Sequence, residues 1–298
     1  MTKAMTCSAL PLRLGLTQWS HNHWIQSLYG KGCKNGDRLA RYAEIFTTVE
    51  GNTTFYATPN MTTVKKWHDA TPDHFRFTFK LPQTITHQQQ LRHCDQAVAD
   101  FLNTMHVLAP KTAIWKIQLP AQFGPDALPV LAKFLNKFPS HLTTGVEVRH
   151  PEFFTKGAAE QALNRLLIEK NSNRIIMDSR PLFSAQATTA AIIEAQRKKP
   201  RLPVHAIATA NNPVIRFIGH PNDSHNDPFF NNWLQRIPLW LAEGKQPYLF
   251  IHSPDNNHAP ESAMRLYRRL QQQVALTIPL VDLAQPQHLQ QNQQIALL

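Results

Sequence analysis

The chain has 298 residues, of which 42% are hydrophobic and 17% are charged. This composition is typical of a globular protein and excludes intrinsic disorder for the bulk of the chain. With 31 basic and 20 acidic side chains, the formal net charge is +11, which slightly favours a polyanionic partner. We find no long apolar run and no signal-peptide core among the first residues, so we expect a cytoplasmic protein with no membrane partner.

Motifs that mark several common enzyme classes are missing. The cluster Gly30, Gly32 and Gly36 does not have the spacing of a dinucleotide-binding loop, and no phosphate-binding Walker loop is found. A zinc-protease helix and a hydrolase nucleophile elbow are also missing. The three cysteines are widely spaced, which argues against a disulfide framework or a thiolate zinc site. The cofactor and the reaction therefore stay unknown at this stage.

Short runs rich in β-branched and aromatic residues alternate with longer segments of helical periodicity. This alternation predicts βαβ units and a parallel sheet. The expected strands cover residues 12–19, 46–53, 75–81, 113–119, 144–149, 174–179, 213–219 and 248–252. Eight strands with helices between them predict an α/β fold of the TIM type, a (β/α)₈ barrel.

The expected helices lie between these strands, at residues 37–46, 62–70, 88–108, 126–136, 157–170, 229–243 and 260–270. The pattern is clearest in 88–108, where apolar residues recur at steps of three to four and form one face. These residues are Leu91, Cys94, Val98, Leu102, Met105 and Leu108.

One segment does not fit the repeat. Residues 184–212 are too long for a simple connection and contain a basic run at 197–201. We interpret them as an insertion after the sixth strand, whose helix-like part could cover the barrel mouth. The expected organisation is a single domain at 12–275, an N-terminal tail at 1–11 and a frayed, Gln-rich tail at 276–298.

Charged residues are expected inside the barrel. Alternate residues of a barrel strand face the helices and the lumen, and the three phenylalanines of run 75–81 suit the helix side. Arg76, Thr78 and Lys80 then point inward. The same parity assigns to the lumen Glu50, Asn52, Lys116, Gln118, Glu147, Arg149, Asp178, Arg180, Arg216, His220, His252 and the approach to Asp255. Structural barrel interiors consist mainly of Val, Ile and Leu, so this one is unusually polar.

Two interpretations of these charges stay open, and both can hold. The carboxylates can pair with the basic residues in a self-neutralising network, because burying an unpaired charge is costly. Alternatively, the charges form a site at the C-terminal strand ends, where barrel enzymes place their chemistry.

A functional site of this composition predicts an anionic ligand, phosphorylated or carboxylated. Glu147 or Glu50 would act as general base with a pKa raised by burial. The remaining candidate residues would bind or orient the ligand: Trp19, Asn52, Lys80, Gln118, Arg149, Asp178, Arg180, Arg216, His252 and Asp255.

Two other functions remain as alternatives. Glu50, Glu147, Asp178 and His252 could hold a divalent metal in a hydrolase or isomerase, although nearby arginines oppose this and we assign no metal ligand. A non-catalytic nucleic-acid-binding protein could use the barrel mouth and residues 197–201 together as a basic groove, with Trp19 and Trp24 as stacking platforms. In a purely structural interpretation, the basic run forms a solvated face and the tryptophans pack as a lid on neighbouring loops.

The sequence resembles the YecE-like proteins of the family called domain of unknown function 72. The matching stretches are residues 15–20 (GLTQWS), 49–56 (VEGNTTFY), 75–77 (FRF) with Lys80 and Pro82, 86–87 (TH), 118–120 (QLP), 146–151 (VEVRHP), 178–180 (DSR) and 253–256 (SPDN). The resemblance implies a TIM-barrel-like fold and no assigned activity. It also implies a likeness to the divergent barrels of xylose isomerases and apurinic endonucleases, and hence to sugar-phosphate or nucleic-acid ligands. The full set of His and carboxylate ligands of a three-metal phosphodiesterase is not evident here.

Overall fold

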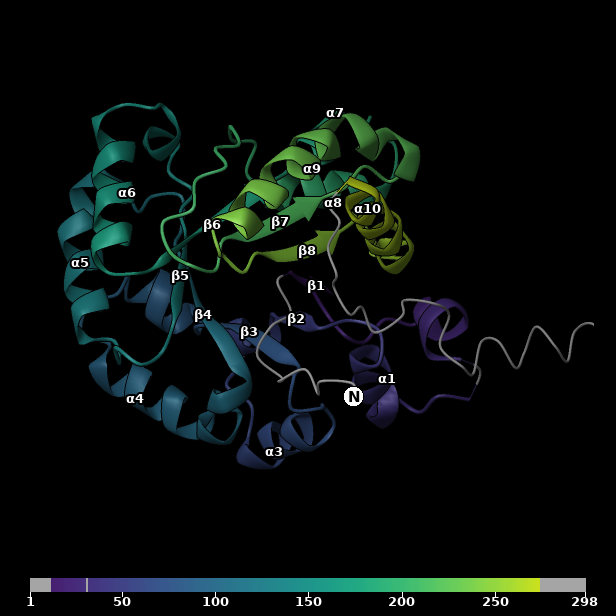
Figure 1. Ribbon diagram of the computed structural model, residues 1–298. Coiled ribbons are helices and arrows are strands. Elements are labelled where there is room, and N and C mark those ends of the chain that lie inside the picture. The colour runs from purple at the N-terminus through teal and green to yellow at the C-terminus, as the bar shows by residue number, and fades with distance from the viewer. Residues whose placement is uncertain (1–11, 31, 274–298) are drawn as a thin grey trace, which may run out of the picture.

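Eight parallel strands close into a barrel in which each strand pairs with the next and β8 pairs with β1 (Figure 1). The computed structural model describes residues 12–30 and 32–273, so the expected tails at 1–11 and 276–298 lie outside the described residues. The strands are β1 (Arg13–Leu16), β2 (Thr48–Gly51), β3 (Arg76–Lys80), β4 (Thr112–Gln118), β5 (Thr144–Glu147), β6 (Asn173–Asp178), β7 (Val214–Ile218) and β8 (Tyr248–His252). The predicted (β/α)₈ fold is confirmed.

Helices surround the barrel (Figure 1). Seven of them match the expected positions: α1 (Arg38–Ala43), α3 (Met61–Asp69), α4 (Asp95–Thr104), α5 (Leu128–Lys137), α6 (Ala158–Glu169), α9 (Asp227–Ala242) and α10 (Ala259–Gln273). Two more, α2 (Thr53–Tyr56) and α7 (Arg180–Ser184), were not expected, and α8 (Ala190–Lys198) lies within the insertion, for which a helix-like part was expected. None of the helices in the described part of the chain is long and apolar enough to cross a membrane.

The helix predicted at 88–108 is wrong in its first turns. Gln90, Leu91 and His93 have φ angles of 46°, 63° and 50°, in the left-handed region that a right-handed helix cannot use. The helix α4 therefore begins at Asp95. Leu91 and Cys94 are nevertheless buried. Their spacing thus predicted correctly that they are buried, although these two side chains reach the core from a loop and not from a helix.

The predicted insertion supplies the crossover between β6 and β7. Leu182 of α7 and Ala195 of α8 pack with Ile218 of β7 in a small buried cluster. After α8 the chain continues without helix or strand to β7, and its first part, residues 199–203, is called the strap below.

Apolar packing occurs on both sides of the sheet. The larger cluster lies between the strands and the surrounding helices and includes Phe77 and Phe217. A second, smaller cluster fills part of the barrel interior and consists of Ile114, Ile175, Val214, Tyr248 and Phe250. Polar side chains of the same strand parity continue from this inner plug toward the C-terminal strand ends, where the candidate site lies.

Candidate functional site

Four ionic side chains from four strands form a closed set in the lumen. Arg216 of β7 donates from Nε and Nη2 to the two carboxylate oxygens of Glu50, each at 2.8 Å, and from Nη1 to Oε2 of Glu147 at 2.7 Å. Lys116 of β4 donates to Oε2 of Glu50. All four are buried. We call them the inner quartet; with two cations and two carboxylates it neutralises itself.

The carboxyl groups of the quartet are held as anions. Burial alone raises the pKa of Glu50, but Arg216, Lys116 and Lys80 together bring it well below its usual range. Burial also raises the pKa of Glu147, and the cations led by Arg216 and Arg149 likewise lower it below the usual range. The predicted upward shift is therefore wrong, because attraction to several cations outweighs desolvation. Neither group stores a proton at neutral pH.

Three further cations lie at the C-terminal end of the barrel: Lys80, Arg149 and Lys199. The Nζ of Lys80 is 4.0 Å from Oε1 of Glu50. Arg149 donates from Nε and Nη2 to Oε1 of Glu147 at 3.1 and 2.8 Å. The strap contributes Lys199, which interacts electrostatically with Arg216 and both glutamates. We call these three the outer cations.

Lys199 differs from the other two outer cations because its amine makes no hydrogen bond or ion pair with any residue that the structure describes. Burial, with Arg216 nearby, lowers its pKa to about 8. Burial also lowers the pKa of Lys116 to about 8 and brings that of Lys80 well below its ordinary value. Five cationic side chains thus share this space with two carboxylates. Burial is the main cause of these shifts, and repulsion from Arg216 adds to it.

Several polar atoms at the mouth are buried without a partner in the described residues. They are Oδ1 of Asn52, Oε1 of Gln118, Nδ1 of His252 and Oγ of Ser253. The amide of Asn52 is oriented because its Nδ2 donates to the carbonyl oxygen of Thr17 at 2.8 Å. Leaving such groups unpaired costs about 1 to 3 kcal/mol each. They are therefore available to hydrogen-bond a ligand that enters the mouth.

Two ionisable side chains at the mouth, His252 and Lys199, have lowered pKa values. Burial, together with Lys199 and Arg216, lowers the pKa of His252 well below its usual value, so its imidazole is neutral. A pKa this low also makes His252 a weak base, as it does Glu50 and Glu147. Lys199, with a pKa of about 8, is an acid whose pKa lies close to neutral pH.

Sequence reasoning did not assign Lys199 or His87 to the site. His87 lies close enough to two outer cations to interact with them electrostatically. Burial, Arg149 and Lys80 all lower its pKa. Its ring contacts Phe55 edge to face, with the centroids 5.0 Å apart. The Thr86–His87 pair among the family-like stretches was a usable signal for this residue. Lys199 gave no such signal, because it lies within the basic run.

Asp178 does not point into the lumen as predicted. Its Oδ2 accepts a hydrogen bond of 2.8 Å from Nε1 of Trp233 in α9. Arg174, on the same parity of β6, reaches Glu160 of α6, whereas Ile175 belongs to the inner plug. The parity of β6 thus turns Asp178 toward the helices. Arg180, which pairs with it through Nε and Nη2, leaves the lumen set as well.

The tryptophans and Asp255 lie at the periphery of the mouth. The ring of Trp19 packs against Trp67 of α3 with the centroids 5.1 Å apart. Trp24 is fully buried and donates from Nε1 to the carbonyl oxygen of Asn256. A buried indole cannot stack a nucleobase, so this part of the nucleic-acid alternative is wrong. Asp255 is exposed and accepts from the backbone N–H of Asn257 in its own loop.

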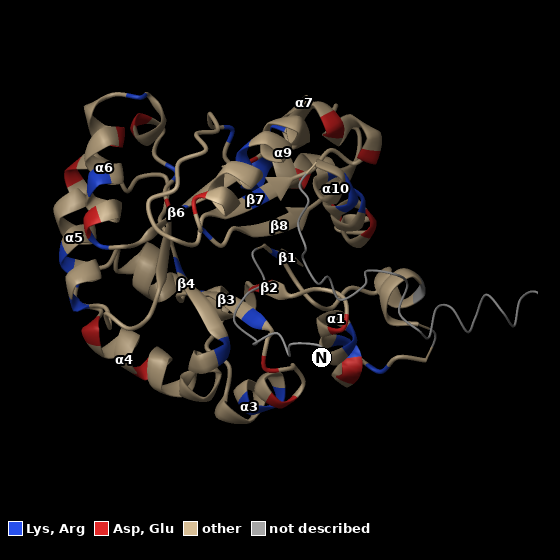
Figure 2. Cartoon of the chain, in the orientation of Figure 1, with Lys and Arg blue, Asp and Glu red and all other residues tan. Residues whose placement is uncertain are grey.

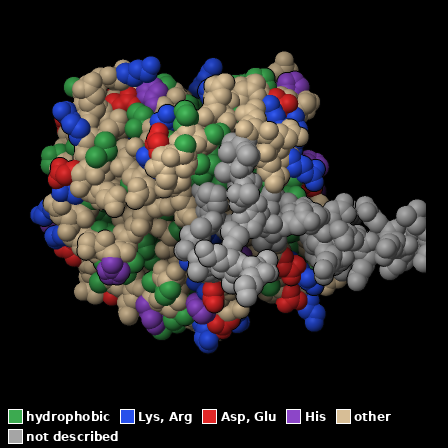
Figure 3. Space-filling view, in the orientation of Figure 1, with side chains coloured by type: hydrophobic (Ala, Val, Ile, Leu, Met, Phe, Trp, Pro, Cys, Tyr) green, Lys and Arg blue, Asp and Glu red, His purple; other side chains and the backbone are tan. Residues whose placement is uncertain are grey.

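The basic side chains of the run 197–201 contact three different parts of the molecule, so they do not form one basic groove. Arg197 and Lys198 pair with Glu194 of α8. Lys199 joins the lumen charges, and Arg201 lies against α7. Lys and Arg residues are also spread around the molecule and interspersed with acidic ones (Figure 2), and the face in Figure 3 shows no continuous basic stripe.

Of the residues considered as metal ligands, Glu50 and Glu147 are brought together, but Arg216 lies between their carboxylates. Residues 12–30 and 32–273 contain no group of three or more His, Cys, Asp or Glu side chains that could hold a metal ion. Asp178 is turned to the helix side, and Glu50 and Glu147 are already paired with cations. The metal-dependent alternative is therefore dropped on geometric grounds.

A family model described as "Protein of unknown function DUF72" matches residues 13–288. The chain belongs to the DUF72 family. This DUF72 chain is 48% identical over 257 residues to the UPF0759 protein YecE of Escherichia coli K12, covering 86% of this chain and 92% of the relative. The YecE protein of Escherichia coli O157:H7 matches at the same identity and coverage. The resemblance drawn from the sequence is confirmed.

Solved structures of two other DUF72 proteins share the fold. One from Enterococcus faecalis V583 has a TM-score of 0.68 at 20% identity, with 87% of this chain and 95% of that chain covered. One from Thermotoga maritima MSB8 has a TM-score of 0.66 at 18% identity, with 87% and 99% covered. Likeness at this identity shows the barrel fold of the family and nothing about a ligand.

Proposed function

We propose that the protein binds a small anionic ligand, through a phosphate or a carboxylate group, at the C-terminal mouth of its barrel. The observation that supports this most is the charge imbalance at the mouth, where five cationic side chains accompany two carboxylates. A buried surplus of positive charge is costly unless an anion offsets it. An anionic ligand supplies that charge.

The residues divide into a frame and a binding set. Arg216 uses Nε, Nη1 and Nη2 on Glu50 and Glu147, so it belongs to the frame and not to the groups that meet the ligand. Lys80 and Lys199 are the least committed cations and contact the anion directly in this proposal. The unpartnered atoms of Asn52, Gln118 and His252 orient the rest of the ligand.

The test compares two adjacent lysines of the strap region. In Lys199→Met the mouth loses an uncommitted cation, whereas in Lys198→Met only an exposed pair with Glu194 is lost. Isothermal titration calorimetry with inorganic phosphate, glucose 6-phosphate and succinate should show binding of at least one of them. We expect Lys199→Met to weaken it by about tenfold or more, since a hydrogen bond to a charged group contributes about 1.5 to 3 kcal/mol. Lys198→Met should change it by less than about twofold.

Two results would contradict the proposal. One is that none of the three anions binds to the folded wild-type protein. The other is that both lysine variants lose affinity equally, which would mean that the overall positive charge, and not the mouth, attracts the anion. A short oligonucleotide in the same titration covers the nucleic-acid alternative, for which affinity must fall steeply with salt.

A further inference from the structure

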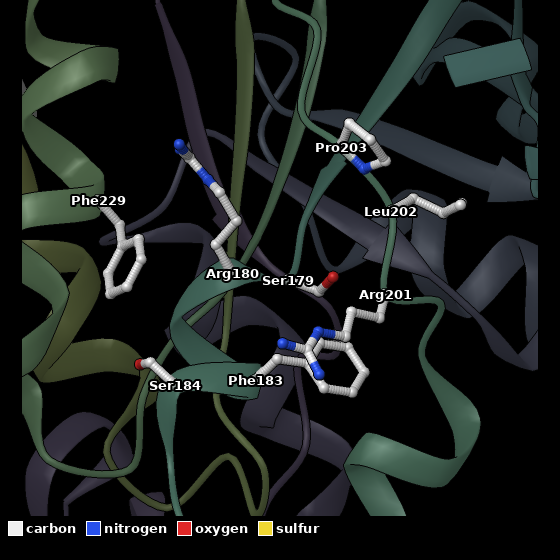
Figure 4. A pocket seen from close by; sticks show the side chains of 8 residues that line it. All are labelled: Ser179, Arg180, Phe183, Ser184, Arg201, Leu202, Pro203 and Phe229. Carbon is white, nitrogen blue, oxygen red and sulfur yellow. The ribbon is translucent and has the colours of Figure 1, made fainter. Parts of the chain in front are cut away.

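A cavity of about 470 Å³ lies next to the C-terminal end of β6, between α7, the strap and α9. Its lining includes Ser179, Arg180, Phe183, Ser184, Arg201 and Phe229 (Figure 4). These residues come from the end of β6, from α7, from the strap and from α9. The volume is within the range of small-molecule pockets, which is about 300 to 1,000 Å³.

Two arginines in this cavity each lie over a phenylalanine ring. The guanidinium carbon of Arg180 is 5.8 Å from the ring centroid of Phe229, and that of Arg201 is 5.7 Å from the centroid of Phe183. Figure 4 shows the two arginine–phenylalanine pairs around the cavity. Contact with an aromatic face uses the flat side of a guanidinium and leaves its N–H edge free for a carboxylate or phosphate.

Arg180 is held in place by a buried anchor. Its Nε and Nη2 donate to the two oxygens of Asp178 at 2.9 and 2.7 Å. Asp178 is fully buried and also accepts from Trp233. Arg180 is thus preorganised through one edge, and its Nη1 makes no hydrogen bond within the part of the chain that the structure describes.

Arg201 is exposed and makes fewer polar contacts than Arg180. Its guanidinium forms no ion pair and no hydrogen bond with any described residue, and its contact is the ring of Phe183. The strap separates the two sites, because Leu202 lines this cavity and also a small space beside Glu147. Arg201 lines this cavity, whereas Lys199 does not and interacts electrostatically with the lumen charges.

We propose that this cavity is a second binding site, separate from the barrel mouth, for an anion with a flat ring. The charged group meets the free guanidinium edges of Arg201 and Arg180, and the ring packs against Phe183 and Phe229. A carboxylate or a phosphate satisfies this chemistry equally well, so the class of ligand is an aromatic carboxylate or a nucleoside monophosphate.

Four probes separate the two requirements, charge and ring. Adenosine 5′-monophosphate and benzoate carry both, adenosine carries only the ring, and inorganic phosphate carries only the charge. Titration calorimetry on the full-length protein should show that adenosine monophosphate or benzoate binds at least about tenfold more tightly to this site than adenosine does.

Matched variants assign the binding to the cavity. Arg201→Met should weaken it by about tenfold or more, whereas Arg197→Met, four residues earlier and paired with Glu194, should change it by less than about twofold. Lys199→Met should leave it within the same twofold range, because Lys199 does not line this cavity and interacts with the lumen charges instead. Arg201 is exposed, so its replacement is not expected to impair folding.

Three outcomes would overturn the proposal. They are equal losses in Arg201→Met and Arg197→Met, no binding of any ring-bearing anion, and a loss of ring-bearing anion binding in Lys199→Met with none in Arg201→Met. The last of these would place the ligand in the barrel mouth, so it would support the proposed function while removing the second site.

Discussion

Arg216 holds two buried carboxylates at once, from β2 and from β5, and is itself buried. Replacing it with methionine keeps much of the side-chain volume but leaves Glu50 and Glu147 with fewer partners. Breaking a buried ion pair costs about 3 to 5 kcal/mol, so we expect Arg216→Met to lower the free energy of unfolding by about that much. Urea denaturation measures it.

The control for this prediction is a surface pair. Arg269 donates to Asp227 near the molecular surface, and Arg269→Met should cost no more than about 1 kcal/mol. If both variants unfold at the same urea concentration, the inner quartet does not stabilise the barrel. Adding Glu50→Gln to Arg216→Met should lower the stability further, because the buried Lys116 then loses its carboxylate partner.

The pKa of Lys199, about 8, predicts how anion binding depends on pH. The ammonium form attracts an anion, and a bound anion raises the pKa further, so binding takes up protons. Affinity should therefore be greatest below the free pKa and should fall as the pH rises through about 8. Titration with sulfate between neutral and alkaline pH measures this, because the charge of sulfate is constant there.

Lys199→Arg is the matched variant for the pH dependence, because a guanidinium stays charged over this range. Its affinity should fall less with pH than that of the wild type. Some fall should remain, since the pKa of Lys116 is also about 8. An unchanged pH profile in Lys199→Arg would mean that Lys199 does not meet the anion.

At the scale of the elements, barrel closure depends on a close approach between β1 and β2. A Cβ atom placed on Gly15 would lie 2.0 Å from the carbonyl oxygen of Thr48. Because that oxygen is backbone, the strands would have to move apart. We expect Gly15→Ala to lower the free energy of unfolding by about 1 to 3 kcal/mol or more.

Gly36→Ala provides the comparison for Gly15, because a Cβ there would have no atom within 4 Å. Its unfolding midpoint in urea should stay close to that of the wild type, within about 0.5 kcal/mol in free energy. Equal stability of the two variants would show that β1 and β2 tolerate a wider spacing than the structure has.

At the scale of the whole molecule, the net charge of +11 is spread and not concentrated. Basic and acidic side chains are interspersed around the barrel (Figure 2). We therefore expect a short single-stranded oligonucleotide to bind weakly, with an affinity that falls steeply as salt rises. Arg201→Met and Arg197→Met should lose the same small factor in fluorescence anisotropy, since each removes one charge. A selective, large loss in Arg201→Met would instead indicate a nucleic-acid contact at the strap.

Much of the fold could be predicted because strand order and helix spacing are local properties of the chain. Each of the eight strands lies within the run expected for it, apart from one residue at the start of β4 and one at the start of β6. Apolar periodicity was less secure as a guide to helices. At Leu91 and Cys94 it reported which side chains are buried but not the backbone that carries them.

The parity of side chains could be predicted for most strands and failed at one. Glu50, Lys116, Glu147 and Arg216 meet in the lumen, as alternation along β2, β4, β5 and β7 requires. Asp178 does not join them, because Trp233 of α9 offers it a hydrogen bond on the other face of β6. Trp233 is 55 residues away in the sequence, so no local sequence pattern around Asp178 indicates this partner.

The sequence by itself determined the barrel, its charged interior and its family, because each of these depends on residue type and short-range spacing. The tertiary structure alone decided the sign of the pKa shifts at Glu50 and Glu147, since that sign depends on which cations surround each carboxylate. It alone decided that Lys199 joins the barrel mouth while Arg201 lines a separate cavity. Two residues apart in an irregular segment, they have no periodicity to predict their directions, and only packing against the barrel sets them.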